Sequence, residues 1–487
     1  MKKRAVIIGS GVAGLACSIR LAARGVDVTV LEANAYPGGK LTAFELNGYR
    51  FDAGPSLFTM PQWVLALFEL AKEDPNVHFK YKRKTVACHY FWEDDTQFFA
   101  PSNRDEFAAK AAQTFGVNPQ KILSYFKRAE KKFKLTRSLF LEQSLHKLKT
   151  FLSLDTLNAI VHLNTYQLHT TLHQANRSHF KNPKLVQLFD RYATYNGSSP
   201  YETSGMMTLI QHLEQHYGTY IPEGGMHQIT LSLFALAKRL GVQFHFDTRA
   251  DEILTKNNQV EGVKAGEKFY PADQVVSNMD VVPTYAKLLP QHPAPQKIMK
   301  QERSSAAVIF YWGITKEFPQ LDLHNIFFAK DYQAEFEAIF KDKKIAEDCT
   351  VYVNITSKDV PQDAPKGCEN WFVMINTPAD YGQDWEALVQ RLRTQVLTKL
   401  SKRLKTELEP LIACEEILTP PLIEQKTQSY KGALYGSSSN KAMAAFLRHP
   451  NFSQEIKNLY FCGGSVHPGG GIPLCLLSAK IVDELSK

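Results

Sequence analysis

The sequence predicts an α/β fold, in which a Rossmann-like nucleotide-binding domain is interleaved with an α+β domain and a helical region. Two observations carry this prediction. A short apolar run at residues 5–8 leads into a Gly-x-Gly-x-x-Gly turn and then into a helical pattern, which is typical of a dinucleotide-binding βαβ unit. Near the other end, five glycines fall within the nine positions 463–471, between two apolar runs. Such a cluster lets backbone approach a ligand closely.

Length and composition agree with a globular protein. The 487 residues allow two or three domains, and 44% hydrophobic with 22% charged residues is ordinary. No apolar run approaches the roughly 20 residues of a membrane-spanning helix. The apolar segment after Lys3 is too short for a signal peptide, so we expect a first strand and a protein that is cytoplasmic or faces the cytoplasm. The seven cysteines contain no CxxC pair and predict buried, reduced thiols.

The N-terminal unit predicts a nucleotide site in detail. Gly9 permits the tight turn, Gly11 lets backbone approach a pyrophosphate, and Gly14 lets helix and strand pack closely. The start of the helix supplies unpaired N–H groups. The second strand, residues 26–31, ends in Glu32, which can accept hydrogen bonds from a ribose. The contacts predicted here are Gly9, Ser10, Gly11, Ala13, Gly14, Glu32 and Ala33.

The next segments favour a flavin over a nicotinamide dinucleotide. A Pro-Gly-Gly-Lys turn follows Glu32, and an Asp-x-Gly-Pro-Ser segment ends at Ser56. This arrangement resembles the flavin-containing amine oxidase and carotenoid desaturase superfamily, in which such a turn lies along the flavin. Lys40 stands where many members have Arg. The resemblance implies FAD as cofactor and contacts from Gly39, Lys40, Leu41, Gly54, Pro55, Ser56 and, beside the adenine, Ala250.

The middle of the chain, residues 100–215, is predicted to be mostly helical. The segment between positions 121 and 149 contains nine Lys or Arg but only two acidic residues. Apolar residues recur at helical spacing from Ile122 to Phe133, and a second apolar segment covers 151–163. This pattern fits a basic amphipathic surface on an anionic bilayer, or a solvated helix face over a core. The basic residues in question are Lys127, Arg128, Lys131, Lys132 and Lys134.

Neither nucleic acid nor a metal is expected as a ligand. No segment matches a recognised nucleic-acid-binding module. His162, His169 and His173 lie in the helical region, the last two four residues apart. That spacing can hold a metal, but no third ligand stands at a matching position, so we predict no metal site.

Later segments predict two sheets. Strands at 242–246, 260–263 and 273–280 are predicted to return to the nucleotide sheet. β-branched and aromatic runs at 307–312, 350–354 and 371–375 predict an antiparallel sheet against the substrate. The predicted FAD-binding domain comprises 1–80, 225–285 and 430–487, and the substrate-binding domain comprises 81–105 and 286–429. The helical, membrane-associating region is 106–224.

The C-terminal loop narrows the resemblance. A strand at 459–462, the glycine loop and a helix from Ile472 resemble the signature of bacterial-type phytoene and carotenoid desaturases, with Val466 where Ala or Thr is usual. Segments 191–200, 222–226, 324–326 and 432–436 agree. The residues at 36–41 and at 54–61 are most similar to those of the hydroxycarotenoid 3,4-desaturase branch. The glycines let backbone N–H groups approach the flavin, which predicts contacts from Gly463, Gly464, Gly470, Gly471 and Ile472.

The resemblance implies an FAD-dependent desaturase that introduces C=C bonds into a long polyene by hydride transfer to flavin. It also implies a peripheral position on the cytoplasmic side of a membrane, with oxygen or a quinone as electron acceptor. Arg191 and His467 are candidate catalytic groups; a salt bridge and a structural loop residue are the respective alternatives. Other functions left open are phytoene desaturation, redox-neutral carotenoid isomerisation, amine oxidation and a flavin-binding scaffold for pigment synthesis.

Overall fold

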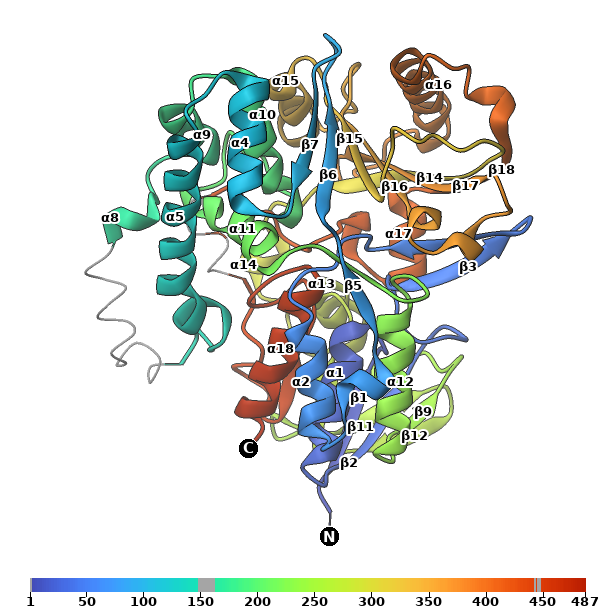
Figure 1. Cartoon of the computed structure of the whole chain (residues 1–487). Coiled ribbons are helices and arrows are strands. Elements are labelled where there is room, and N and C mark those ends of the chain that lie inside the picture. Colours follow the sequence, from blue (N-terminus) through green and yellow to red (C-terminus); the bar gives the residue numbers. More distant parts are fainter. Residues whose placement is uncertain (1, 148–162, 442–443, 445–447) are drawn as a thin grey trace.

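The computed structural model describes residues 2–147, 163–441, 444 and 448–487. His162 and nearly all of the apolar segment predicted at 151–163 lie outside these residues. Figure 1 shows three parts: a nucleotide half at the bottom with both chain ends, a large sheet at the upper right and a group of helices at the upper left. The combination of helices with a parallel and a mixed sheet confirms the predicted α/β fold class.

A five-stranded parallel sheet forms the centre of the nucleotide half, in the order β19-β13-β1-β2-β9. Segments far apart in the sequence therefore meet in one sheet, as the strand patterns predict, but the strand predicted at 260–263 lies in a separate three-stranded sheet. The strands are β1 (Arg4–Ile8), β2 (Asp27–Leu31), β9 (Gln243–His245), β13 (Gln274–Ser277) and β19 (Leu459–Phe461).

Both faces of this sheet are covered, which explains its continuous apolar runs. Along β1, Ala5 and Ile7 join a core formed with helices, whereas Val6 and Ile8 join a core on the opposite face. The alternation is that of a strand with a period of two residues. The helices are α1 (Val12–Ala23), α2 (Gln62–Leu70), α12 (Gln228–Arg239) and α18 (Ile472–Leu485), and the opposite face packs on β10 (Glu252–Lys256), β11 (Gln259–Ala265) and β12 (Lys268–Pro271).

The large sheet has seven strands in the order β18-β14-β17-β16-β15-β6-β7, and all its pairs are antiparallel except β15 with β6. The three predicted strands are β14, β16 and β17. One face packs against the long helix α16 (Trp385–Leu404), which the sequence patterns did not predict. The strands are β6 (Val86–Phe91), β7 (Gln97–Pro101), β14 (Ala306–Ile314), β15 (His324–Phe327), β16 (Val351–Ile355), β17 (Glu369–Thr377) and β18 (Ile412–Leu418).

The longest helix of the helical part confirms the predicted spacing of buried apolar residues. One lysine that was predicted to lie on its basic surface is buried. In α5 the side chains of Ile122, Phe126 and Phe133 are buried. Lys132 is buried as well, with 2% of its surface exposed, and is not part of a basic surface. The helices are α4 (Arg104–Phe115), α5 (Pro119–Thr136), α8 (Leu163–Tyr166), α9 (Leu172–His179), α10 (Pro183–Asp190) and α11 (Thr208–His212).

Lys132 is buried because α5 packs against loops that offer it three acceptors. Its Nζ donates to Gln167 Oε1 at 2.6 Å, to the Gly205 carbonyl at 2.8 Å and to Thr208 Oγ1 at 2.8 Å. These bonds use all three ammonium hydrogens. Lys132 therefore ties α5 to the segment that leads into α11, on the side away from solvent.

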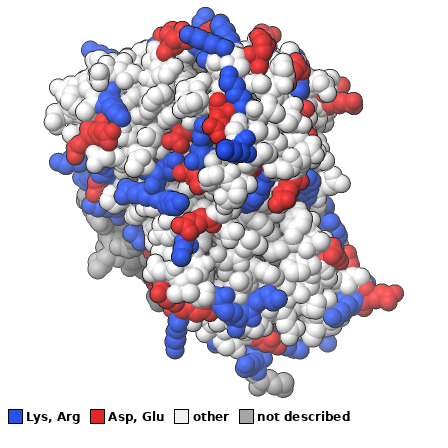
Figure 2. Space-filling model, turned by 45° about the vertical axis from the view of Figure 1, so that its right-hand side comes forward, with Lys and Arg blue, Asp and Glu red and all other residues white. Residues whose placement is uncertain are grey.

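Short elements join the three parts. They are β3 (Thr42–Leu46), β4 (Tyr49–Gly54), α3 (Pro75–His78), β5 (Tyr81–Arg83), β8 (Tyr220–Pro222), α13 (Val281–Pro283), α14 (Gln296–Met299), α15 (Tyr332–Glu337) and α17 (Pro420–Thr427). In the described part of the chain, no helix combines the length and apolar character needed to cross a membrane. On the face in Figure 2, basic and acidic side chains are interspersed, so charge of one sign is not gathered there.

Candidate cofactor and substrate site

One cavity of about 1230 Å³ is lined by residues from all three parts of the molecule. Of the predicted cofactor contacts, Ser10 and Gly14 do not line it, and the others do. The predicted contacts that line it are Gly9, Gly11, Ala13, Glu32, Ala33, Gly39, Lys40, Leu41, Gly54, Pro55, Ser56, Ala250, Gly463, Gly464, Gly470, Gly471 and Ile472. The two ends of the chain thus meet at the same cavity.

Two long helices begin at this cavity. Gly11 is the N-cap of α1 and Gly471 is the N-cap of α18, and neither helix start has a side-chain cap among the described residues. The first N–H groups of each helix are therefore left for a ligand, and the helix dipoles favour negative charge there. Ser478 fixes the loop before α18, because its Oγ accepts a hydrogen bond from the Gly463 N–H at 2.8 Å. This arrangement suits the diphosphate of a dinucleotide.

Glu32 lies at the end of β2, and its carboxylate accepts four hydrogen bonds from the protein. Oε2 accepts from the Ser10 N–H and hydroxyl, both at 2.7 Å. Oε1 accepts from the Asn34 backbone and side-chain nitrogens, both at 2.9 Å. Ser10 therefore contributes by holding Glu32 and does not line the cavity itself. A ribose hydroxyl can bind Glu32 by replacing one of the two side-chain donors.

Lys40, the last residue of the Pro-Gly-Gly-Lys turn, brings an amino group to the cavity. Its Nζ donates to the Leu434 carbonyl at 2.9 Å. Burial lowers the pKa of Lys40, and the nearby Asp280 carboxylate opposes that shift. Asp280 also lines the cavity, so this cation and its counter-charge face the same space.

The other half of the cavity is mainly apolar. Helical residues lie on one side and strand residues of the seven-stranded sheet on the other. This lining includes Leu209, Ile210, Leu213, Ile309, Ile326, Phe372, Met374 and Leu418. Such walls bind a hydrocarbon chain by removing its surface from water.

Arg191 lies at the cavity, with 6% of its surface exposed. Its Nη2 donates to the Tyr90 hydroxyl at 2.6 Å and lies 3.4 Å from Glu214 Oε2. Its Nη1 donates to the Tyr195 hydroxyl at 3.1 Å, and Tyr195 in turn donates to Glu214. Arg191 thus forms the salt bridge that was the alternative for it, and it also lines the cavity; its catalytic role stays a prediction.

His467 is placed differently from Arg191. It does not line the cavity, and its ring Nε2 donates to the Gln143 carbonyl at 2.9 Å. Burial lowers the pKa of His467 to about 4, which keeps the ring neutral. Its backbone N–H donates to the His449 carbonyl. The position of His467 is that of a structural loop residue, and it does not support the predicted catalytic role.

A polar group on the sheet side of the cavity was not among the predicted site residues. The Tyr352 hydroxyl lies 2.8 Å from Ser56 Oγ and 2.7 Å from His324 Nδ1, and all three residues line the cavity. They come from the segment after β4 and from β16 and β15. No spacing in the sequence relates such positions, because strand pairing alone brings them together. For metals, no group of three or more ligating side chains occurs within the described ranges.

The residues of the nucleotide half fit an FAD. Two uncapped helix starts, a glycine loop at each and an acidic strand end meet at one end of the cavity, beside a space large enough for a second ligand.

Comparison with known proteins gives concordant results. Residues 12–482 match the family described as flavin containing amine oxidoreductase. The chain is 56% identical over 483 residues to the 1-hydroxycarotenoid 3,4-desaturase of Flavobacterium sp. (strain P99-3), covering 99% of each chain. It is 32% identical over 494 residues to the 4,4'-diaponeurosporene oxygenase of Staphylococcus aureus, covering 99% of this chain and 98% of that one.

Among solved structures, an oxidoreductase from Methanosarcina mazei superposes with a TM-score of 0.66 at 14% identity, covering 99% of this chain and 100% of the other. That likeness supports the fold. The predicted resemblance and the predicted FAD cofactor are confirmed by the family match and the 56% identical relative. The chain belongs to the flavin containing amine oxidoreductase family.

Proposed function

We propose that the chain is an FAD-dependent carotenoid desaturase that carries out 3,4-desaturation of an acyclic or monocyclic hydroxycarotenoid. The observation that carries the proposal is the continuity of the cavity, which runs from Glu32 and Ala250 to the apolar walls around Phe372 and Met374. A dinucleotide and a long polyene can therefore lie in contact within one cavity. The 56% identical relative, whose name is 1-hydroxycarotenoid 3,4-desaturase, supports the choice of substrate.

FAD, when bound, supplies a two-electron acceptor for a hydride from the substrate. The chain's own contribution is position and exclusion of water. The apolar walls hold the polyene along the cavity, and orientation of this kind supplies much of a rate enhancement. The carboxylate of Glu214 accepts hydrogen bonds from the hydroxyls of Tyr192 and Tyr195 and pairs with Arg191, so it holds these side chains in place at the helical side of the cavity.

We also propose that the protein lies peripherally on the cytoplasmic side of a membrane and that oxygen or a quinone reoxidises the flavin. A polyene of this length does not dissolve in water, so the enzyme must collect it from a bilayer. The exposed side chains of Lys127, Arg128, Lys131 and Lys134 on α5 support this proposal, because basic residues near an anionic surface favour binding to it.

A product assay tests the proposed function. Purified FAD-loaded protein is mixed with liposomes that carry a 1-hydroxycarotenoid, γ-carotene or phytoene, and products are resolved by mass and absorption. Loss of two hydrogens from the hydroxycarotenoid with a red shift is expected. Conversion of phytoene alone would indicate a phytoene desaturase, and an isomerised product of unchanged mass would indicate an isomerase. Unchanged pigments with full flavin occupancy would refute the proposal and leave amine oxidation or a flavin-binding scaffold.

A further inference from the structure

His324 is a buried residue in the wall of the cavity. It begins β15, has 4% of its surface exposed and lines the cavity. Asn354 fixes its tautomer, because the Asn354 Nδ2 donates to the Leu323 carbonyl at 2.8 Å and must therefore be the amide nitrogen. The same Nδ2 lies 3.3 Å from His324 Nδ1. The Tyr352 hydroxyl, 2.7 Å from the same nitrogen, can donate to it. Because an amide nitrogen only donates, a hydrogen on Nδ1 would point at another donor, which favours the tautomer with the hydrogen on Nε2.

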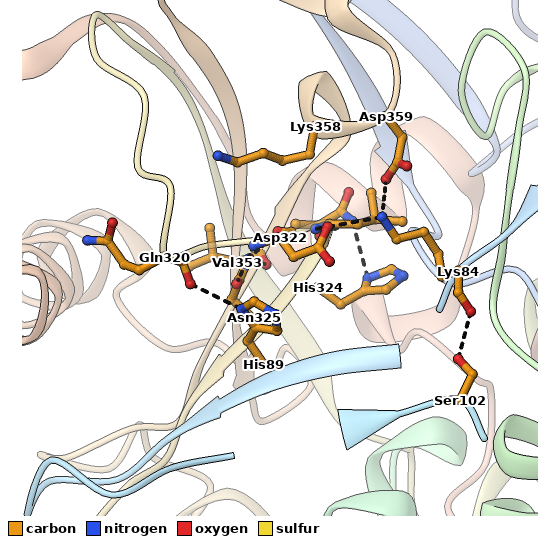
Figure 3. Close-up of polar contacts among 12 residues, drawn as sticks. Lys84, His89, Ser102, Gln320, Asp322, His324, Asn325, Val353, Lys358 and Asp359 are labelled. Atoms are coloured by element: carbon orange, nitrogen blue, oxygen red, sulfur yellow. Dashed lines mark hydrogen bonds and ion pairs between the residues drawn. The ribbon is translucent and has the colours of Figure 1, made fainter. Parts of the chain in front are cut away.

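That Nε2–H group has no partner among the residues that the structure describes. Burial lowers the pKa of His324 to about 3, which agrees with a neutral ring that has a single hydrogen. In Figure 3 one ring nitrogen of His324 has a dashed contact and the other has none. A buried donor without an acceptor is unfavourable and rare in folded proteins. It therefore indicates that a ligand atom completes the site.

Arg191 offers a second donor of the same kind. Its two terminal nitrogens bind Tyr90, Tyr195 and Glu214, but its Nε has no partner in the described part of the chain. Arg191 lines the same cavity. Tyr90, which accepts a hydrogen bond from Arg191, pairs with Ile326 across β6 and β15, two residues after His324, so Arg191 and His324 belong to the same part of the cavity wall.

The backbone around His324 is firmly held. Lys84 Nζ lies 3.0 Å from Asp322 Oδ1 and 2.7 Å from Asp359 Oδ2, in the loops before β15 and after β16. Figure 3 shows this cluster beside the His324 ring. The Nδ1 contact with Tyr352 fixes the ring from the other side. The direction of the unpaired Nε2–H is thus set by the fold.

An oxygen atom is the ligand group that satisfies both donors. A hydroxyl oxygen has two lone pairs and can accept from a neutral imidazole and from a guanidinium together, whereas a hydrocarbon offers no acceptor. We propose that Arg191 and His324 form the site that binds the hydroxyl oxygen of the polyene substrate, and that this site selects oxygenated over purely hydrocarbon polyenes. The inference rests on the proposed desaturase function and names the residues that decide its substrate.

The test compares a 1-hydroxycarotenoid with the same polyene lacking the hydroxyl. Three variants are made: His324→Phe, which removes the donor and keeps a ring; His324→Gln, which restores an N–H; and Arg191→Lys, which keeps a charge beside Glu214. The matched control is His89→Phe, because His89 binds the Gln320 carbonyl at 3.1 Å and does not line the cavity. Flavin content verifies folding, and substrate affinity is measured by quenching of flavin fluorescence.

The expected result is a change in the ratio of kcat/KM for the two substrates. For His324→Phe the hydroxycarotenoid value should fall by about 10- to 100-fold, because a site built to bind a hydroxyl loses its donor, while the hydrocarbon value changes little. His324→Gln should recover part of the loss, Arg191→Lys should also lower the ratio, and His89→Phe should leave it unchanged.

Two results would overturn the inference without refuting the proposed function. Equal use of both substrates by the wild-type protein would refute the selective site while supporting desaturation. An unchanged ratio in flavin-loaded Arg191→Lys and His324→Phe would do the same. Conversion of neither substrate by the wild-type protein would instead refute the proposed function on which the inference rests.

Discussion

Gly14 approaches the carbonyl oxygen of Gly9 so closely that a Cβ added to Gly14 would lie 2.1 Å from that oxygen. The first turn of α1 therefore packs directly on the end of β1. Because no side chain intervenes, the helix begins at the cavity with its N–H groups turned toward a ligand. The third glycine of the sequence pattern thus acts through packing and does not line the cavity itself.

Gly14→Ala should therefore displace the start of α1 and release FAD. The added methyl group meets backbone, which cannot move away as a flexible side chain can, and overpacking of this kind costs about 1–3 kcal/mol. We expect a clear loss of flavin absorption per protein and a lower melting temperature. The matched control is Gly116→Asn. Gly116 has φ +64° and nothing within 4 Å of an added Cβ, and Asn tolerates the left-handed conformation. Full flavin occupancy in Gly14→Ala would refute this account of the turn.

Glu32→Ala should weaken FAD binding without unfolding the protein. The change removes the acceptor for Ser10 and Asn34 and the group that would bind the ribose. Hydrogen bonds to a charged group contribute about 1.5–3 kcal/mol, so the dissociation constant should rise about tenfold or more. Titration of apoprotein with FAD measures it. Glu45→Ala serves as control, because Glu45 is exposed on β3. Wild-type affinity in Glu32→Ala would show that Glu32 does not contact the cofactor.

The nucleotide half could be predicted in detail because its signals are local. The turn at Gly9 and the acid at Glu32 belong to one βαβ unit, so their spacing in the sequence fixes their spacing in space. The site of His324 and Tyr352 could not be predicted, because strand pairing between distant segments creates it. Lys132 was assigned to a basic face, since helical periodicity does not reveal that neighbouring loops offer three acceptors. The direction of the His467 ring could not be predicted either, because the ring binds the carbonyl of Gln143, which is distant in the sequence.

Lys132 should make stability depend on pH above neutrality. Burial lowers its pKa to about 7, whereas in the unfolded chain a lysine titrates near 10.4. Between these values the unfolded state binds more protons, so the free energy of unfolding should rise with pH from about 7 to about 10. Lys132→Met removes this contribution. Melting temperatures of both proteins at about pH 7 and about pH 9.5 provide the test, and identical pH dependence would contradict the assignment.

The exposed face of α5 should govern binding to anionic membranes. Each basic residue near such a surface contributes about 1 kcal/mol, so Lys127→Gln with Lys131→Gln should weaken binding to phosphatidylserine vesicles by about 30-fold in a cosedimentation assay. The control is Lys402→Gln with Lys405→Gln, two exposed lysines at the end of α16. Binding should fall with added salt in the wild-type protein. Equal losses in both double variants would argue against a membrane-binding role for α5.

The proposed function requires that one cavity holds FAD and a hydroxycarotenoid together, so that a hydride passes from the carotenoid to the flavin. A single-turnover experiment without oxygen tests it most directly. FAD-loaded protein is mixed with a 1-hydroxycarotenoid in liposomes, and flavin absorption and pigment absorption are followed together. The mass of the product is determined by mass spectrometry. The oxidised flavin band should bleach at the same rate as the pigment shifts to the red, with one product molecule lacking two hydrogens formed per flavin. A red-shifted product formed without flavin bleaching, or an unbleached flavin beside unchanged pigment, would contradict it.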